Sequence, residues 1–305
     1  MKKVSLIFVA VFGFTFSACA PQHCPESDFR AEPVDGGASV RIVEYLGESW
    51  EVRIPSRIRN LPVTHIGTGA FRESSLTSIT IPNSVIYIEA NAFTSNQLTN
   101  IDIPDSVVYI EANAFANNQL TNVAIPDSVA QIGNSAFANN QLTSITIPDN
   151  VTQIGTWAFA NNQLANVTIP NSITVISNSV FRYNQLTTVT ILGNVTSIHP
   201  FAFSGNQLTS IMIPSTVTSI SQNAFRSNQL TGVTIPDSVT YIWGEAFMNN
   251  QLTYVTIPYS IRSVGIRAFR NNQLVSVSIP SHASIITSVW GDAPSFDPEV
   301  TITRR

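Results

Sequence analysis

The side chains best suited to catalysis or metal binding are scattered through this sequence. The four histidines are His23, His65, His199 and His282, and no two of them have the short spacing of a zinc-binding pair. His199 stands where related segments have Gly or Glu, which indicates a variable turn position. No serine lies in a nucleophile elbow, and no glycine-rich phosphate loop occurs. We therefore expect neither a cofactor nor an enzymatic activity.

A row of aspartates is the nearest approach to a cation site. Asp105, Asp127 and Asp149 occur at intervals of 22 residues, and each follows a proline. In stacked coils about 4.8 Å apart they would form an acidic row, and Ca²⁺ prefers carboxylate oxygens. Aspartate after proline is also a common turn residue. We favour the turn interpretation and expect no metal, because the same position elsewhere holds uncharged residues: Asn83, Asn171 and Ser215.

Aromatic and arginine side chains gather late in the chain. Earlier outward positions are small and, apart from Asp102, uncharged, whereas Met212 and Tyr254 interrupt this pattern. Trp, Tyr and Arg dominate binding energy at protein interfaces, so the composition predicts a protein-binding patch. The alternative is that terminal coils vary and that some of these side chains cover the C-terminal cap. The predicted patch comprises Tyr241, Trp243, Tyr254, Tyr259, Arg262, Arg267 and Arg270.

An Asn-Gln pair recurs every 22 residues. A turn into a buried strand leaves backbone N–H and C=O groups that need partners, and asparagine supplies both a donor and an acceptor. We expect a structural ladder of buried asparagines with each glutamine directed outward; a binding ladder is the alternative. The ladder comprises Asn96, Asn118, Asn140, Asn162, Asn184, Asn206, Asn228, Asn250 and Asn272.

The N-terminus has the features of a bacterial secretion signal. Two lysines precede an apolar run of 13 residues, 4–16, which is shorter than the about 20 residues that span a bilayer and suits a signal peptide. The segment "FSAC" at 16–19 resembles a lipobox with Phe16 in place of the usual Leu, and it predicts lipidation of Cys19. The alternative is ordinary cleavage after Ala20, without a lipid.

Lipidation would anchor the protein to the cell envelope, at the outer-membrane surface, without a spanning segment. It would leave Cys24 as the remaining cysteine, and because both cysteines precede the expected fold we expect no disulfide framework. Only 11% of the residues are charged and the net charge is -4. This composition gives no reason to expect nucleic acid as a partner.

A repeat of 22 residues organises most of the chain. Ten phenylalanines, from Phe71 to Phe269, recur at this interval, as do ten isoleucines from Ile81 to Ile279. The unit at 96–115 contains L-x-x-I-x-I, which predicts a strand with one buried face, and the proline that follows ends it. Each coil can be covered only by its neighbours. Six residues of this unit are predicted to face inward: Leu98, Ile101, Ile103, Val107, Ile110 and Phe115.

The repeat is irregular at both ends, where a solenoid needs caps. Around Gly47 and Glu48 the sequence alternates between apolar and polar residues, which predicts a charged hairpin over the first coil. At the other end Trp290 and Phe296 are expected to cover the last coil. The predicted boundaries are a signal peptide at 1–19, a tether at 20–37 and a solenoid domain at 38–305, with a hairpin cap at 38–54, repeats at 54–286 and a C-terminal cap at 287–305.

The segment "LTSITIPNSVIYIEANAF", at 76–93, and its copies resemble the BspA-like, or treponemal-type, bacterial leucine-rich repeats over roughly 54–286. The resemblance implies a mainly β, right-handed, curved solenoid of parallel strands with little helix. It also implies cell-surface exposure and adhesion to extracellular or host proteins. The chain departs from the family by having Asn-Gln where Cys and a longer spacer are common. A structural envelope protein that self-associates, without a host ligand, is the alternative function.

Overall fold

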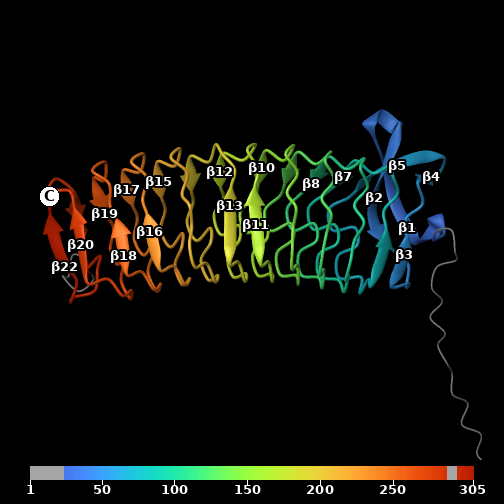
Figure 1. The fold of residues 1–305 in the computed structure, drawn as a ribbon. Coiled ribbons are helices and arrows are strands. Elements are labelled where there is room, and N and C mark those ends of the chain that lie inside the picture. Colours follow the sequence, from blue (N-terminus) through green and yellow to red (C-terminus); the bar gives the residue numbers. More distant parts are fainter. Residues whose placement is uncertain (1–23, 287–293) are drawn as a thin grey trace, which may run out of the picture.

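The computed structural model describes residues 24–286 and 294–305. They wind into a β-solenoid of about 12 turns with a spacing of about 22 residues, and Figure 1 shows the coils stacked along one axis. The helical elements of this part of the chain are two single 3-10 turns, η1 (Glu26–Asp28) and η2 (Asp35–Gly37). The prediction of a mainly β solenoid with parallel strands and little helix is confirmed.

One side of the solenoid, the front face, is formed by the L-x-x-I-x-I segments. Burial alternates along it: Val167 is 2% exposed and Ile169 is 1% exposed, whereas Asn166 and Thr168 face solvent. Strands of neighbouring coils pair in parallel with equivalent residues opposite each other. The front strands are β3 (Glu51–Arg53), β6 (Ser78–Thr80), β11 (Asn166–Ile169), β13 (Thr188–Ile191), β16 (Gly232–Thr234), β18 (Tyr254–Thr256), β20 (Ser276–Ile279) and β22 (Thr301–Arg304).

The front face is not a continuous sheet. Ile101 and Ile103 are 6% and 4% exposed, as predicted for a buried strand edge, but their segment is not a regular strand. Between β6 and β11, the front segments join through a single bridge, Ala124↔Thr146. Buried and exposed residues thus alternate on the front face of every coil, whereas regular parallel hydrogen bonding between front strands forms in only some of them.

A second side, the back sheet, is built mostly from two-residue strands in which an outward residue precedes a buried Ile or Val. The partners are again equivalent positions, such as Tyr87↔Tyr109 and Ile88↔Ile110. The second apolar edge that the sequence predicts therefore consists of hydrogen-bonded parallel strands, with an interruption of the pairing between β10 and β12. Its strands are β5 (Leu61–Ile66), β7 (Tyr87–Ile88), β8 (Tyr109–Ile110), β9 (Gln131–Ile132), β10 (Gln153–Ile154), β12 (Val175–Ile176), β14 (Ser197–Ile198), β15 (Ser219–Ile220), β17 (Tyr241–Ile242), β19 (Ser263–Val264) and β21 (Ser284–Ile285).

One phenylalanine per coil fills the interior. The ten rings from Phe71 to Phe269 are 0–1% exposed, and neighbouring rings stack with centroids 5.2–5.8 Å apart. Burial of each ring contributes roughly 1.5–3 kcal/mol, and stacking adds about 0.5–1.5 kcal/mol per pair. Both contributions act between coils, so the coils stabilise one another along the axis.

The asparagine of each Asn-Gln pair joins its coil to the preceding one. Asn140 Nδ2 donates to the carbonyl oxygens of Phe137 (3.1 Å) and Phe115 (3.0 Å), and Asn140 Oδ1 accepts from Leu120 N–H (3.0 Å). The other eight asparagines of the ladder make the equivalent bonds. The neighbouring Gln141 is exposed. These contacts give the asparagines a structural role.

The N-terminal cap differs from the predicted hairpin. β2 (Ser39–Tyr45) pairs antiparallel with β1 (Phe29–Val34), which precedes it, and parallel with β5. β3 lies on the front face and pairs with β6 instead of β2. The prediction of a hairpin within 38–54 is therefore wrong. The alternating apolar and polar residues of 38–54 belong to β2 and β3, which lie on different sides of the first coil because the chain turns between them.

Much of the predicted tether at 20–37 belongs to the fold, so that boundary is also wrong. Phe29 packs its ring against Tyr45 (5.6 Å) and Phe71 (6.3 Å). Cys24 is 1% exposed, its N–H donates to Arg53 C=O (2.9 Å), and its sulfur is disulfide-bonded. The expectation that Cys24 precedes the fold and forms no disulfide is therefore wrong. The predicted signal peptide and the lipidation site Cys19 lie outside the described residues.

At the C-terminal end, Phe296 takes the place of the next core ring. It is 1% exposed and stacks on Phe269 with centroids 5.3 Å apart. β22 (Thr301–Arg304) then pairs in parallel with β20 on the front face. Trp290, which was expected to share this role, lies outside the described residues. The cap thus continues both the aromatic stack and the front strands.

Candidate functional site

The fold keeps the potential metal ligands and bases apart. Within 24–286 and 294–305, no group of three or more His, Cys, Asp and Glu side chains could hold a metal ion. His65 Nδ1 lies 2.8 Å from the Thr64 hydroxyl, and burial lowers the pKa of the His65 imidazole. His282 packs edge-on against Tyr259, with ring centroids 4.7 Å apart. His65 and His282 thus each have a local packing partner. The aspartates of the predicted row lie in exposed turns: Asp105, Asp127 and Asp149.

The predicted late-coil patch divides into separate groups. Tyr241 and Trp243 project from the back sheet, with ring centroids 6.4 Å apart. Tyr254 projects from β18 on the front face, and Tyr259, 67% exposed, lies in the turn between the two sides. Residues close in sequence face different directions because the chain turns around the coil between them. The arginines of the patch follow Tyr259 along the chain, one coil beyond Tyr241 and Trp243: Arg262, Arg267 and Arg270.

Tyr254 belongs to a group of exposed apolar side chains, the front patch, that also contains Leu192 and Met212. Their exposed fractions are 52% for Leu192, 85% for Met212 and 59% for Tyr254. A hollow of about 420 Å³ is lined by Leu192 and Met212, and a second of about 460 Å³ by Met212 and Tyr254. The Tyr254 ring lies over Gly232, where an added Cβ would be 2.2 Å from the ring. The front patch is therefore one surface with Met212 at its centre.

Sequence reasoning found Met212 and Tyr254 but missed Leu192 as a member of this surface. The sequence does distinguish Leu192, because it follows the one isoleucine of the ten, Ile191, that is not followed by proline. With an N–H group available, Leu192 donates to Ile169 C=O (3.0 Å). The substitution continues the strand and places an apolar side chain beside the hollow.

A second group that sequence reasoning missed surrounds Arg182. Its guanidinium lies over the rings of Trp157 (5.1 Å), Tyr183 (4.5 Å) and Phe201 (4.6 Å). The three aromatic residues have φ of 62°, 54° and 59°, a left-handed backbone that is unusual for bulky residues. Cation–π contacts of this kind contribute about 0.5–2 kcal/mol each, which offsets that conformational cost. The group stabilises the turns of three consecutive coils.

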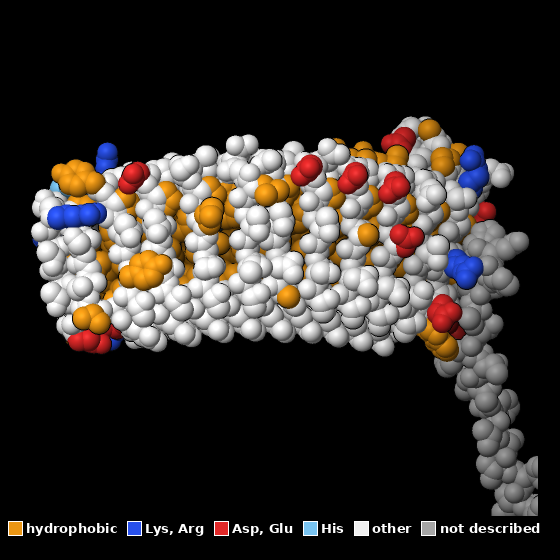
Figure 2. Space-filling view, viewed as in Figure 1, with side chains coloured by type: hydrophobic (Ala, Val, Ile, Leu, Met, Phe, Trp, Pro, Cys, Tyr) orange, Lys and Arg blue, Asp and Glu red, His pale blue; other side chains and the backbone are white. Residues whose placement is uncertain are grey.

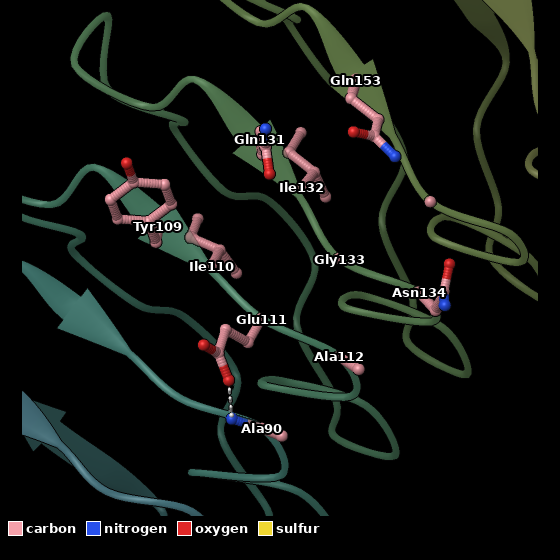
Figure 3. A pocket seen from close by; sticks show the side chains of 11 residues that line it. Ala90, Tyr109, Ile110, Glu111, Ala112, Gln131, Ile132, Gly133, Asn134 and Gln153 are labelled. Carbon is pink, nitrogen blue, oxygen red and sulfur yellow. Dashed lines mark hydrogen bonds between the residues drawn. The ribbon is translucent and has the colours of Figure 1, made fainter.

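The back sheet contains a third surface feature, a hollow of about 380 Å³ beside β8, β9 and β10. Figure 3 shows Tyr109, Gln131 and Gln153 projecting from successive strands along it, with Glu111 and Asn134 at its side. The Glu111 carboxylate accepts a hydrogen bond from Ala90 N–H (2.9 Å). The aromatic row leading to this hollow was not recognised from the sequence, although its members recur at the interval of the repeat.

Charged side chains lie mainly at the ends of the solenoid. Figure 2 shows an almost uncharged front surface, with acidic side chains along one rim and basic ones near the two ends. Ion pairs follow this distribution: Arg41 pairs with Glu89 (2.7 Å) near the N-terminal cap, and Arg267 lies 3.6 Å from Glu245 near the C-terminal one. The front patch consequently presents apolar contact area with little electrostatic selectivity.

Comparisons with known proteins agree with this architecture. A family model described as a BspA type leucine rich repeat region, in six copies, matches residues 64–187 and 174–290. A leucine-rich repeat protein of T. pallidum is 26% identical, with a TM-score of 0.52 over 60% of this chain and 89% of that one. No curated protein sequence matches the chain significantly.

Two further solved structures cover more of the chain and show the fold. A leucine-rich repeat protein from Bacteroides ovatus is 19% identical, with a TM-score of 0.51 over 91% of this chain and 98% of that one. The pneumococcal vaccine antigen PcpA is 18% identical, with a TM-score of 0.50 over 91% and 96% of the two chains. In the part of the chain that the structure describes, no helix has the length and apolar character needed to cross a membrane.

Proposed function

The chain belongs to the BspA-type leucine-rich repeat family, and from this premise we propose that it is an exported, surface-located scaffold that adheres to extracellular or host proteins. A solenoid of this kind presents a long exterior whose residues are free to vary, because the core positions alone maintain the fold. Its use as a protein-interaction scaffold fits the repeat architecture in general. Adhesion is our proposal for its specific role.

The observation that carries this proposal is the front patch. Met212 is 85% exposed although the interior already buries a complete set of apolar side chains, so its presence outside serves no packing need. Exposed apolar groups of this kind mark interaction sites when they cluster beside concave surface. Leu192, Met212 and Tyr254 satisfy that condition, since two hollows adjoin them. We assign protein contact primarily to this surface.

The remaining exposed aromatic residues of the late coils form a second contact area in the proposal. Trp243 is 55% exposed and Tyr241 is 42% exposed on the back sheet. Arg262, Arg267 and Arg270 lie in the coil beyond them. Because the two areas face different directions, a partner bound to the front patch would leave the back-sheet residues accessible. Substitutions in each area therefore distinguish the face that binds.

A double variant, Met212→Thr with Tyr254→Ser, restores the small polar residues that most coils have on the front face. We expect its attachment to immobilised host extracellular-matrix proteins to weaken at least about tenfold, as loss of interface hot spots predicts. The matched comparison is Tyr241→Ser with Trp243→Gly in the second contact area, which should retain most of the attachment because protein contact is assigned primarily to the front patch. Surface plasmon resonance measures binding, and circular dichroism checks that each variant is folded.

Equal attachment of the front-patch variant and the unmodified protein would contradict the assignment, as would loss of attachment in the back-sheet control alone.

Self-association without a host ligand is the alternative function. One observation favours it: β22 ends the front face with all four residues exposed, Ile302 among them at 39%. Sedimentation of the same samples separates the alternatives, because only self-association makes the apparent mass depend on concentration.

For localisation, we propose export by the signal at 1–19 and anchoring through a lipid on Cys19, at the outer-membrane surface. The basic and apolar segments and the "FSAC" motif support this proposal. The disulfide at Cys24 is the competing outcome: the chain has two cysteines, so a thioether at Cys19 would leave Cys24 as a free thiol, and lipidation requires that this disulfide is absent from the mature protein. Mass spectrometry of the mature N-terminal peptide should find an acylated Cys19. An unmodified N-terminus that begins after Ala20, or a disulfide joining the two cysteines, would refute lipidation.

A further inference from the structure

A row of planar side chains runs along the outside of the back sheet over its first coils. The His65 ring stacks on Tyr87 with centroids 4.4 Å apart and an interplanar angle of 10°. Tyr87 stacks on Tyr109 at 5.1 Å and 5°. Strand register places Gln131 and then Gln153 next in the same row. Five consecutive coils thus present a flat aromatic or amide group at one position.

The aromatic stack ends at Tyr109. One face of this ring contacts Tyr87, and the other face is directed along the axis towards Gln131, where no further ring continues the stack. Tyr109 is 38% exposed, and it lines the hollow of about 380 Å³ described above. The exposed part of an aromatic ring that borders a hollow can pack against the apolar C–H face of a ligand ring.

Two glycines open this hollow. Gly133 and Gly155 stand where the two preceding coils have Glu89 and Glu111, and they form part of its lining. A Cβ at Gly133 would lie 2.4 Å from the backbone carbonyl carbon of Glu111, so the close approach of the coils admits no side chain there. The result is a notch beside the outward row, with Gln131 and Gln153 on its margin (Figure 3).

The polar groups at the hollow suit a neutral ligand. Glu111 already accepts from Ala90 N–H (2.9 Å), and Asn134 Oδ1 accepts from Thr156 N–H (2.9 Å). The amides of Gln131 and Gln153 are exposed, and each offers two N–H donors and a carbonyl acceptor. No cation lines the hollow, and the Glu111 carboxylate repels anions. A ligand rich in hydroxyl groups and without charge matches these properties.

The site is confined to the first half of the back sheet. In the coils that follow, the equivalent positions are Val175, Ser197 and Ser219, which provide neither a ring nor an amide. An aromatic residue returns at Tyr241, beside Trp243. The hollow beside β8, β9 and β10 therefore combines an aromatic stack with amides, which the three coils after it do not provide.

We propose that this hollow, together with the row from Tyr87 to Gln153, binds a neutral linear oligosaccharide built from pyranose rings. One sugar ring would pack its C–H face against the part of the Tyr109 ring that is exposed at the hollow, and the next sugars would follow the row with hydroxyls hydrogen-bonded to Gln131 and Gln153. Coils about 5 Å apart offer one amphipathic group per coil, which suits a polymer with a regular repeat. This inference does not depend on the protein-binding role of the front patch, since the site lies on another side of the solenoid.

Isothermal titration calorimetry with cellohexaose, chitohexaose and maltohexaose as probes tests the proposal on the mature protein. We expect at least one of these neutral probes to bind. Tyr109→Ala and the double variant Gln131→Ala with Gln153→Ala should each weaken its binding by about tenfold. The matched control is Tyr241→Ala, which removes an exposed tyrosine from the equivalent position of a later coil of the same sheet; its affinity should equal that of the unmodified protein.

Thermal unfolding verifies that each variant retains the fold, since Tyr109 lies outside the core. The absence of binding by all three probes at their solubility limits would overturn the proposal. So would equal affinities of the Tyr109→Ala variant and the unmodified protein. Neither result would affect attachment through the front patch, so a failure of this inference and a failure of the proposed adhesion are distinguishable.

Discussion

Replacement of Asn140 by alanine is expected to lower the free energy of unfolding by about 2–4 kcal/mol. The Asn140 amide satisfies two carbonyl oxygens and accepts the Leu120 N–H at 3.0 Å. Phe115 and Phe137 each keep one amide donor from a neighbouring asparagine after the change. Leu120 N–H, by contrast, loses its acceptor, Asn140 Oδ1. An unsatisfied buried N–H costs about 1–3 kcal/mol by itself.

The matched control is Gln141→Ala. Gln141 is the adjacent residue in the same turn and its side chain is exposed, so its loss should change stability by less than about 0.5 kcal/mol. Urea unfolding followed by circular dichroism provides both values. Equal stabilities of the two variants would show that the asparagine ladder is a by-product of repetition and not a source of cohesion between the coils.

The repeated part of the fold could be predicted from the sequence with good accuracy. Phe115 and Leu98 recur at a fixed interval, and an apolar residue that recurs at the same place in every coil must lie in the shared interior, where the structure places both at 0% exposure. The pairing of equivalent residues follows from the same regularity. Every coil repeats one environment, so a single correct interpretation of the unit holds for all of them.

The non-repeated ends could not be predicted in the same way. The segment around Gly47 alternates as a hairpin would, but alternation records only which side of a strand is buried and does not identify its hydrogen-bonding partner. The antiparallel partner of β2 is β1, which lies in a segment whose Pro, Gly and polar residues are typical of a linker. Cys24 was misplaced for the same reason, because no repeat position marks it as buried.

The candidate surfaces were predicted only in part because proximity along the chain differs from proximity on a solenoid. Tyr254 and Tyr259 are five residues apart, yet one projects from the front face and the other from a turn. Tyr87 and Tyr109 are a whole coil apart and their rings stack at 5.1 Å. On this fold, surfaces are found by comparing equivalent positions of successive coils. The front patch, the Arg182 group and the back-sheet row all follow that rule.

Deletion of one whole coil is expected to leave the protein folded, because the coils on either side of the deleted one can pack against each other. Deletion of residues 162–183 joins residue 161 to Asn184 and retains the Asn-Gln register. The new neighbours present the same buried side chains as the old ones, including Phe159 and Phe203. Stability in such an array is a sum of coil and interface contributions, so the shortened protein should unfold cooperatively and at a modestly lower temperature.

The matched control removes residues 162–180, three fewer, and places Phe181 where Asn184 belongs. The coil after the junction then meets its predecessor through a turn with three extra residues, which displaces Asn184 from its bonding position and directs Phe181 out of register. We expect this variant to be unfolded or aggregated. Both deletions leave Tyr109, Met212 and Tyr254 in place, so the first variant should also retain whatever the unmodified chain binds through its surfaces.

Urea unfolding of these two deletion variants, compared with that of the unmodified protein, tests most directly whether interchangeable coils covered by their neighbours make up the molecule. We predict a single cooperative transition for the 162–183 deletion, with an m-value reduced in proportion to one coil of about 12, and no folded state for the 162–180 deletion. Loss of the folded state in both variants, or equal stability of the two, would contradict the account.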